Sequence, residues 1–271
     1  MSNPPLGAPI VLVHGLFGFG QLKLAGVGVA DYFRLIPDAL RVEGHVVPEP
    51  PSLNTAGSIE ERAADLKKYL ENRPEVAGRQ VHLVAHSMGG MDARFMISKL
   101  DMADRILSLT TIGTPHRGSP IADLVGAAAP PGFNQVVQSA GIDIKGIADL
   151  TTTACARFNQ DVPDSPKVRY FSIAGSFVPP RVLGVPVGVL ALTHDIVRNK
   201  ESDNDGVVSV ESARFGERRE NWTFLEIWPG NHFRQINWGT NILLTPSEEN
   251  DNTIVEKYTA LATRLRDLPP L

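Results

Sequence analysis

The sequence has very little cysteine and no targeting segment. Cys155 is the single cysteine among 271 residues, so no disulfide can form within the chain. A disulfide-stabilised scaffold is therefore excluded as a fold class. The first residues, MSNPPLGAPIV, contain neither a basic region nor a long apolar run, so the sequence as written predicts no signal peptide. We therefore expect a cytoplasmic protein, or a secreted one if a leader has been removed.

Long hydrophobic runs and an excess of positive charge are also missing. The apolar stretch FVPPRVLGVPVGVLAL at 177–192 is too short and too rich in proline and glycine to cross a membrane. Lysine and arginine total 26 against 30 aspartates and glutamates, so the net charge of -4 leaves no basic footprint for nucleic acid. The glycine-rich stretch LFGFGQLKLAGVG has neither the P-loop spacing nor the dinucleotide-binding pattern. Membrane-spanning, nucleic-acid-binding and nucleotide-binding functions are therefore not expected.

The rest of the composition is that of an ordinary globular protein with one large core. Hydrophobic residues make up 42% of the chain and charged residues 21%, and there are no repeats, so we expect one domain over residues 1–271. Strand-like and helix-like segments alternate, as a parallel sheet covered on both faces requires. The expected strands are PIVLVHG near the N-terminus, 81–85, 106–112, 168–175 and about 223–228, and the expected helices are 58–73, the segment after Ser87, and 253–266.

The helix at 58–73 has the clearest local signals. Ser58 and Glu61 have the spacing of a capping box, and Pro74 ends the helix. Apolar side chains recur every three or four positions and predict a face that packs into the core rather than a cofactor site. These residues are Ile59, Ala63, Leu66 and Leu70.

The stretch VHLVAHSMGGMDARF places Ser87 where a strand meets a helix. Two positions on either side stand the small residues Ala85 and Gly89, which fits the nucleophile-elbow pattern G-x-S-x-G with alanine in the first place. Larger side chains would clash there, because strand and helix pass closely. In the alternative interpretation, serine and glycine serve only the turn. Ser87 is therefore a candidate nucleophile.

A serine nucleophile needs a base within hydrogen-bond reach and an acid that orients the base. In the fold of this motif, the acid and then the histidine follow the serine along the chain. Of the histidines after the serine, His116 comes too early to leave room for the acid. His194 lies in the apolar segment ALTHDIV, whereas His232 lies in a loop, where site residues usually occur. His232 is the favoured base, and His194 is the alternative.

The acid is expected between Ser87 and His232. Asp205 stands in DNDGVVSV, in a turn that precedes a β-branched run. The N-D-G sequence is also common in turns that have no chemistry. Asp203 and Asp195 therefore remain alternatives to Asp205.

The same chemistry needs two donors for the oxyanion. Near the N-terminus, the strand PIVLVHG runs into His-Gly and a flexible loop. This pattern fits the backbone N–H of Leu16 as the first donor and that of Met88 as the second.

Five motifs, in this order along the chain, resemble the bacterial triacylglycerol lipases of the α/β-hydrolase superfamily. They are VLVHGLFG, VHLVAHSMGGMDAR, IGTPHRGSPIAD, DNDGVVSV and NHFRQIN. The resemblance implies an α/β-hydrolase fold, with a mostly parallel sheet, helices on both faces and a lid or cap insertion. It implies Ser87 as nucleophile, His232 as base and Asp205 as acid, and it favours them over His194 and Asp203.

The resemblance also implies a lipid or ester substrate, two-step acyl transfer and no cofactor. The segment 119–165 resembles the family's lid, which covers the site and opens at a lipid–water interface, and a static cap is the alternative. The stretch 177–192 is expected to line an acyl pocket or to form a hairpin. A carboxylesterase, a thioesterase, an amidase and a catalytically silent binding protein are the other functions considered.

The chain departs from its family at a calcium site. Many of these lipases hold a structural calcium through two aspartates, one of them two residues after the catalytic histidine. Here that position is Arg234, a permanent cation, and the region of the second aspartate, VPPRVLGVPVG, contains no carboxylate. We therefore expect no metal, and an ion pair from Arg234 to a nearby acid in its place. A relocated site that uses Asp195 or Asp203 is the alternative.

Overall fold

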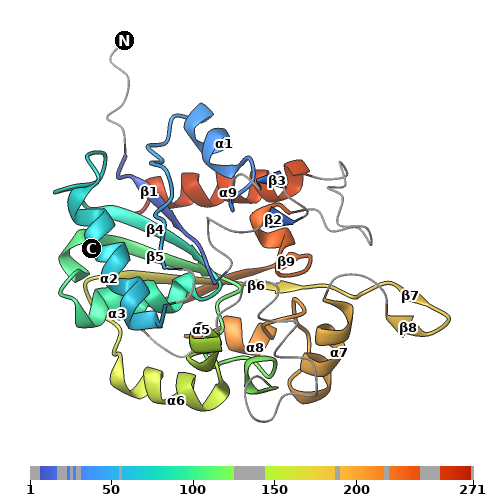
Figure 1. Cartoon of the computed structure of the whole chain (residues 1–271). Coiled ribbons are helices and arrows are strands. Elements are labelled where there is room, and N and C mark those ends of the chain that lie inside the picture. Colours follow the sequence, from blue (N-terminus) through green and yellow to red (C-terminus); the bar gives the residue numbers. More distant parts are fainter. Residues whose placement is uncertain are drawn as a thin grey trace.

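A five-stranded parallel sheet forms the centre of the computed structural model (Figure 1). Its order is β1 (Ile10–Val13), β4 (Val81–His86), β5 (Ile106–Ile112), β6 (Arg169–Ser176) and β9 (Trp222–Pro229), and each neighbouring pair is parallel. The structure describes residues 7–16, 23–24, 27–28, 32–54, 57–124, 144–186, 190–216, 220–238 and 251–269. The expected strands are confirmed close to their expected positions.

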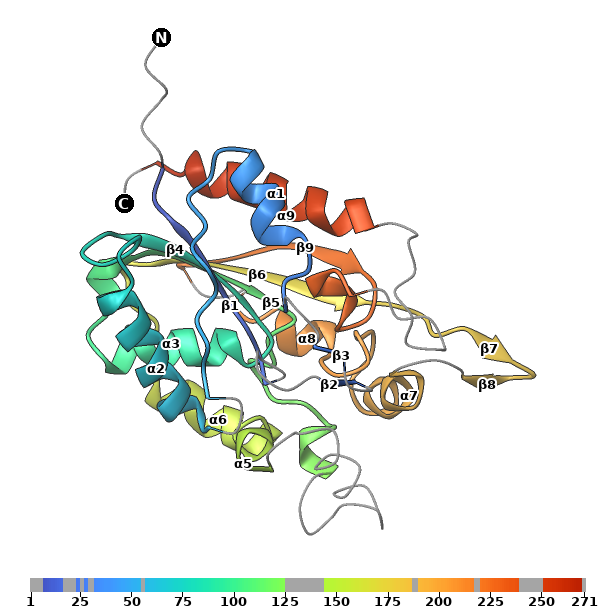
Figure 2. The same cartoon turned by 45° about the horizontal axis from the view of Figure 1, so that its top comes forward.

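Helices cover both faces of this sheet, as the alternation of segments predicted (Figures 1 and 2). On one face lie α2 (Ile59–Asn72) and α3 (Gly89–Lys99), and on the other lie α1 (Ile36–Val42) and α9 (Asp251–Arg266). Successive side chains of a strand point to opposite faces. The strand β1 therefore contributes Val11 and Val13 to the core under α2 and α3, and Ile10 and Leu12 to the core under α1 and α9.

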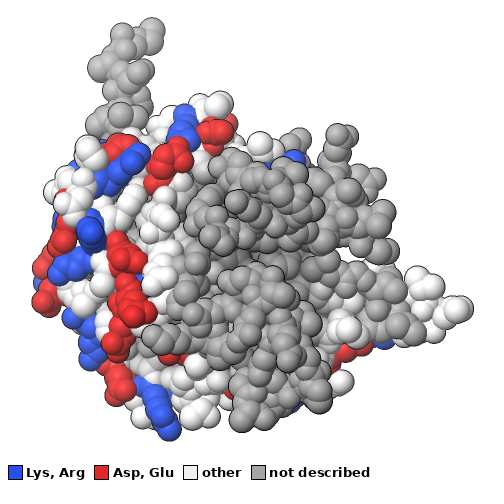
Figure 3. Space-filling model, viewed as in Figure 1, with Lys and Arg blue, Asp and Glu red and all other residues white. Residues whose placement is uncertain are grey.

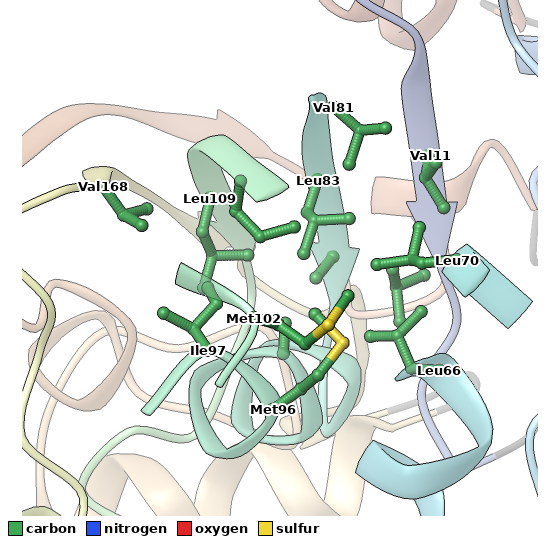
Figure 4. Packing of buried hydrophobic residues seen from close by; sticks show 14 of the residues in the cluster. Val11, Leu66, Leu70, Val81, Leu83, Met96, Ile97, Met102, Leu109 and Val168 are labelled. Atoms are coloured by element: carbon green, nitrogen blue, oxygen red, sulfur yellow. The ribbon is translucent and has the colours of Figure 1, made fainter. Parts of the chain in front are cut away.

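The packing of α2 against α3 and the sheet is tight (Figure 4). Leu66 and Leu70 of α2 and Met96 of α3 are fully buried against Leu83 of β4. The predicted capping box is present, because Ser58 N–H donates to Glu61 at 2.9 Å and Ser58 Oγ accepts from the Glu61 N–H at 3.3 Å. The apolar stripe expected for this helix is buried throughout. A closely packed, buried layer therefore supports β4.

Shorter elements fill the connections. The hairpin expected within 177–192 is present, although 187–189 of that stretch and 125–143 of the 119–165 insertion lie outside the described residues. The hairpin projects from the body of the molecule (Figure 2). The remaining elements are β2 (Lys23–Leu24), β3 (Val27–Gly28), η1 (Ala103–Arg105), η2 (Ala122–Leu124), α5 (Ile144–Ala148), α6 (Thr152–Asp161), β7 (Arg181–Val182), β8 (Val185–Pro186), α7 (Ala191–Lys200), α8 (Val210–Ala213) and η3 (Arg234–Ile236).

Charges of both signs are interspersed over the described part of the face in Figure 3. This distribution shows no basic stripe there of the kind that nucleic acid requires. Within the described part of the chain, no helix combines the length and the apolar character needed to cross a bilayer.

The junction between β4 and α3 generates a stability prediction. A Cβ added at Gly89 would lie 2.8 Å from the Val13 carbonyl oxygen and 2.7 Å from that of His14, and neither backbone atom can move freely. We expect Gly89→Ala to lower the free energy of unfolding by about 1–3 kcal/mol, although alanine normally favours helices. Gly7→Ala is the matched control, because among the described residues its added Cβ would have Arg266 Cγ, at an ordinary 3.6 Å, as its nearest neighbour. Urea unfolding measures both variants, and a Gly89→Ala variant as stable as the control would contradict the packing argument.

Candidate functional site

Ser87 lies in the tight turn between β4 and α3, at the carboxyl end of the sheet. Its φ is 56°, in the left-handed region that residues other than glycine rarely adopt. The Ser87 N–H donates to the Ile112 carbonyl at 2.9 Å, and the Ser87 carbonyl accepts from the Thr114 hydroxyl at 2.8 Å. Such backbone strain persists only where the surroundings fix it. Here the end of β5 fixes the turn, and the turn has the strand-to-helix geometry of the expected elbow.

The structure brings the three candidate triad residues together. Ser87 Oγ lies 3.0 Å from His232 Nε2, and His232 Nδ1 lies 2.7 Å from Asp205 Oδ2. His232 stands in the loop after β9 and Asp205 in the turn after α7, and both side chains are buried. An ionised carboxylate can only accept, so His232 Nδ1 carries the proton of that bond. His232 Nε2 is then left to accept the proton of the Ser87 hydroxyl.

Four hydrogen bonds fix the carboxylate of Asp205. Its Oδ1 accepts from the backbone N–H groups of Val207 and Val208, at 2.9 and 2.8 Å. Its Oδ2 accepts from His232 Nδ1 and from Gln235 Nε2, both at 2.7 Å. The His232 N–H also donates to the Asp205 carbonyl at 2.8 Å. A backbone and a side-chain hydrogen bond thus fix the position of His232 relative to Asp205.

Gln235 is a site residue that sequence reasoning missed. Its buried amide lies between the ends of β5 and β6, where a Cβ at Gly113 or at Gly175 would collide with it. The Tyr258 hydroxyl donates to the Gln235 carbonyl at 3.1 Å. The only sequence signal was its presence in the motif NHFRQIN, which does not reveal its partner. Gln235 therefore positions Asp205 from the side opposite the backbone donors.

The alternative base and acids lie elsewhere. His194 is buried in α7, with its Nδ1 3.3 Å from Asp195. Asp195 accepts two hydrogen bonds from Arg181, at 2.8 and 2.9 Å. Asp203 lies 3.8 Å from Arg198 at the surface. None of these contacts leads to the row that joins Ser87 to Asp205.

The turn after β1 lies directly against the serine. A Cβ at Gly15 would lie 2.7 Å from Ser87 Cβ, so only glycine fits there. Leu16 follows in this turn, and Met88 follows Ser87. Among the described residues, the backbone N–H groups of Leu16 and Met88 donate to no other residue. The structure thus brings both expected oxyanion donors to the edge of the candidate site.

A buried arginine holds this turn. Arg62 Nη2 donates to the carbonyls of His14 and Gly15, at 2.8 and 3.2 Å, and Arg62 Nε pairs with Asp92 at 2.8 Å. Burial raises the pKa of Asp92 to about 7, and the pairing with Arg62 opposes that shift only in part. Burial, assisted by Arg62, lowers the pKa of His14 to about 4, so its ring is neutral. His14 Nε2 accepts from the Leu53 N–H, which leaves Nδ1–H to donate to the Gly15 carbonyl at 2.7 Å.

The described ends of the 119–165 insertion pack against the core. Gly146 of α5 lies against Leu16, where an added Cβ would collide with the leucine side chain. The Asp149 carboxylate accepts from the Ile59 N–H at 2.9 Å, at the beginning of α2. Asp123 accepts from the Thr152 N–H at 2.8 Å and so joins the two ends of the insertion. The lid expectation for the remainder, 125–143, falls outside the described residues.

Within the described ranges, no group of three or more histidine, cysteine, aspartate or glutamate side chains could hold a metal ion. Hydrogen bonds hold the loop of His232. Asn231 Oδ1 accepts from the Arg234 N–H at 3.0 Å, and Asn237 Nδ2 donates to the Arg34 carbonyl at 3.1 Å. The Trp238 indole donates to the Tyr32 carbonyl at 3.0 Å. An ion pair of Arg234 with a nearby acid stays a prediction.

Comparisons with known proteins agree with this architecture. The model of the alpha/beta hydrolase family matches residues 10–265. Triacylglycerol lipase 2 of Saccharomyces cerevisiae is 38% identical over 190 residues, which cover 67% of this chain and 55% of the yeast protein. This chain therefore matches about half the length of that relative. A triacylglycerol lipase of Vibrio cholerae is 30% identical over 266 residues, which cover 84% of this chain and 79% of the relative.

Solved structures show the same fold at lower identity. The Staphylococcus hyicus lipase superposes with a TM-score of 0.75 at 19% identity and covers 98% of both chains. A Bacillus licheniformis lipase in its mature form superposes with a TM-score of 0.69 at 24% identity, over 87% of this chain and 89% of that one. The expected fold is confirmed. The chain belongs to the α/β-hydrolase family, among relatives that are named triacylglycerol lipases.

Proposed function

We propose that this chain is a serine hydrolase that cleaves carboxylic esters, with triacylglycerol as its substrate class. The observation that carries the proposal is the hydrogen-bonded row from Ser87 Oγ through His232 to Asp205. The position of this row at the carboxyl end of an α/β sheet supports it, because that edge is where such sheets bind ligands. The names of the yeast and Vibrio relatives support the substrate class.

In the proposed reaction, Ser87 Oγ attacks the ester carbonyl while His232 Nε2 takes the hydroxyl proton. Asp205 accepts from Nδ1–H and stabilises the imidazolium that forms. The tetrahedral oxyanion accepts hydrogen bonds from the N–H groups of Leu16 and Met88. His232 then gives its proton to the departing alcohol, which leaves an acyl ester on Ser87. Water, deprotonated by His232, attacks this ester, the bond from Ser87 Oγ to the acyl carbon breaks, and the His232 imidazolium returns its proton to Oγ as the fatty acid leaves.

A carboxylesterase or thioesterase of soluble substrates is the second candidate. The observation that favours it is the packing of both described ends of the 119–165 insertion, because a fixed cap needs no lipid surface to open it. An amidase would use the same row of residues. A catalytically silent binding protein is disfavoured, because it would have no need to align Ser87 with His232.

The proposal includes a transient contact of the enzyme with a lipid–water interface. It also includes a single domain over 1–271, in which 119–165 is the lid. Contact with a lipid surface would give the enzyme access to triacylglycerol, which is poorly soluble. The close packing of α5 on Leu16 supports a role of the insertion in covering the oxyanion side of the site.

We expect Ser87→Ala to lower the turnover of p-nitrophenyl esters by about 10⁴ to 10⁶, as loss of a triad member does. Only one hydroxyl is lost, so the variant should fold and melt near the parent. Ser108→Ala is the matched control, because it removes a buried hydroxyl that bonds His82 Nδ1 at 2.8 Å, away from the site. Turnover by Ser87→Ala within tenfold of the parent, in a preparation without contaminating esterase, would disprove the assignment.

We expect a long-chain triacylglycerol to be hydrolysed disproportionately faster once its concentration passes the solubility limit, because an interface would draw a lid from the site. The comparison uses rates with the triacylglycerol, and with p-nitrophenyl esters of increasing chain length, each measured below and above its solubility limit. A rate that follows only the dissolved ester would identify a static cap and favour the soluble-ester alternative.

We expect removal of calcium to leave activity and melting temperature unchanged. Arg234 occupies the position of the family aspartate that follows the catalytic histidine, and the alternative ligands Asp195 and Asp203 are engaged by Arg181 and Arg198. A calcium site needs oxygen ligands with carboxylate charge among them. The measurement compares EDTA-treated protein with and without added calcium, and with magnesium as the control ion. A loss that calcium alone restores would establish a site and contradict this expectation.

A further inference from the structure

Two buried side chains that have no role in the proposed reaction lie between His232 and the turn after β1. We call this turn, which carries Gly15 and Leu16, the oxyanion turn. Tyr32 and His86 are almost completely buried, and Tyr32 Oη lies 2.7 Å from His86 Nδ1. Tyr32 Oη also accepts from the Gly15 N–H at 3.0 Å. The same turn carries Leu16, one of the proposed oxyanion donors.

The direction of these hydrogen bonds follows from the chemistry of the groups. A backbone N–H can only donate, so the Tyr32 oxygen accepts from Gly15, and in the His86 tautomer with its proton on Nε2 the Tyr32 hydroxyl donates to Nδ1. Burial raises the pKa of the Tyr32 hydroxyl far above its usual range, so it keeps this proton. Burial, and after it the charge of His232, holds the pKa of His86 well below its usual range, so the ring is neutral and Nδ1 can accept.

His86 in turn touches the candidate base. The ring centroids of His86 and His232 lie 4.5 Å apart, with an angle of 42° between the rings. A Cβ at Gly15 would lie 2.9 Å from the Tyr32 hydroxyl, so the turn approaches this oxygen as closely as glycine allows. A continuous set of contacts thus runs from the Gly15 backbone through Tyr32 and His86 to His232.

We propose that Tyr32 and His86 are positioning residues that keep the oxyanion turn and the His232 imidazole in one fixed relative geometry. This inference rests on the proposed ester hydrolysis. The base must meet the serine proton while Leu16 N–H meets the oxyanion, and a displacement of about 1 Å can cost 10²-fold in rate. The Tyr32 hydroxyl links the two, because it contacts the Gly15 N–H of the turn and His86 Nδ1, and His86 packs on His232.

Tyr32→Phe tests the hydroxyl directly. We expect kcat for p-nitrophenyl butyrate to fall about 10- to 100-fold with little change in KM, because the geometry of the transition state is lost rather than the binding of the ester. Tyr170→Phe is the matched control, since Tyr170 is also buried and its hydroxyl accepts from the Ser165 N–H at 3.0 Å. Tyr170 lies near the amino end of β6, whereas the site lies at the carboxyl end of the sheet. We expect the melting temperature of Tyr170→Phe to fall about as much as that of Tyr32→Phe, and its kcat to stay at the value of the parent.

His86→Asn and His86→Leu test the link between the two side chains. The two replacements have nearly the same shape, but only asparagine offers an oxygen that can accept from the Tyr32 hydroxyl. We expect kcat of His86→Asn to exceed that of His86→Leu several-fold, and this difference to vanish when Tyr32→Phe is also present.

The outcomes separate this inference from the proposed function. Ester hydrolysis by the parent enzyme tests the proposed function alone. The ratios of kcat between the variants test the positioning role of Tyr32 and His86. Any of three results would overturn the positioning role: a Tyr32→Phe variant with the kcat of Tyr170→Phe, equal kcat values for His86→Asn and His86→Leu, or a difference between those two variants that persists without the Tyr32 hydroxyl.

Discussion

Ser87 is held at a φ of 56° where β4 passes into α3, and the neighbouring elements are arranged around this strained turn. The turn places Ser87 Oγ 3.0 Å from His232 Nε2, and α3 begins close to the backbone of β1. Gly89 makes that approach possible, since any Cβ there would meet the carbonyl oxygens of Val13 and His14. The Thr114 hydroxyl and the Ile112 carbonyl hold the turn from β5. Packing of the helix layer thus stabilises a conformation that the chain would not adopt by itself.

The parallel sheet explains how distant residues reach the turn. The carboxyl ends of parallel strands share one edge, so the loops after β1, β4 and β9 meet there. Each loop is then fixed by buried polar contacts: Arg62 binds the carbonyls after β1, and Asp205 receives four hydrogen bonds while it orients His232. These hydrogen bonds fix the loops around Ser87, which preorganises the site for charge that develops on a substrate oxygen.

Local chemistry decides what could be predicted from the sequence. The elbow at Ser87 and the capping box of α2 are short patterns with their own steric or hydrogen-bonding cause, and the structure has both. The helices α1 and α7 were not predicted, because they begin after Leu35 and Leu190, which are left-handed and offer no side-chain cap. Gln235 and Tyr32 were missed for another reason: their partners lie 30 and 54 positions away, and only the fold creates those contacts. The choice of His232 and Asp205 as partners of Ser87 came from the resemblance to the lipase family, since spacing alone left other residues open, and the catalytic role of the three stays a prediction.

The most direct test of this account is a crystal structure of the enzyme after reaction with an alkyl fluorophosphonate, which mimics the tetrahedral intermediate. We predict a covalent bond from Ser87 Oγ to phosphorus, with one phosphoryl oxygen about 3 Å from the backbone nitrogens of Leu16 and Met88 and with His232 Nε2 beside Oγ. An enzyme that is not labelled at Ser87, or an adduct whose oxygen points away from both nitrogens, would contradict the proposed site.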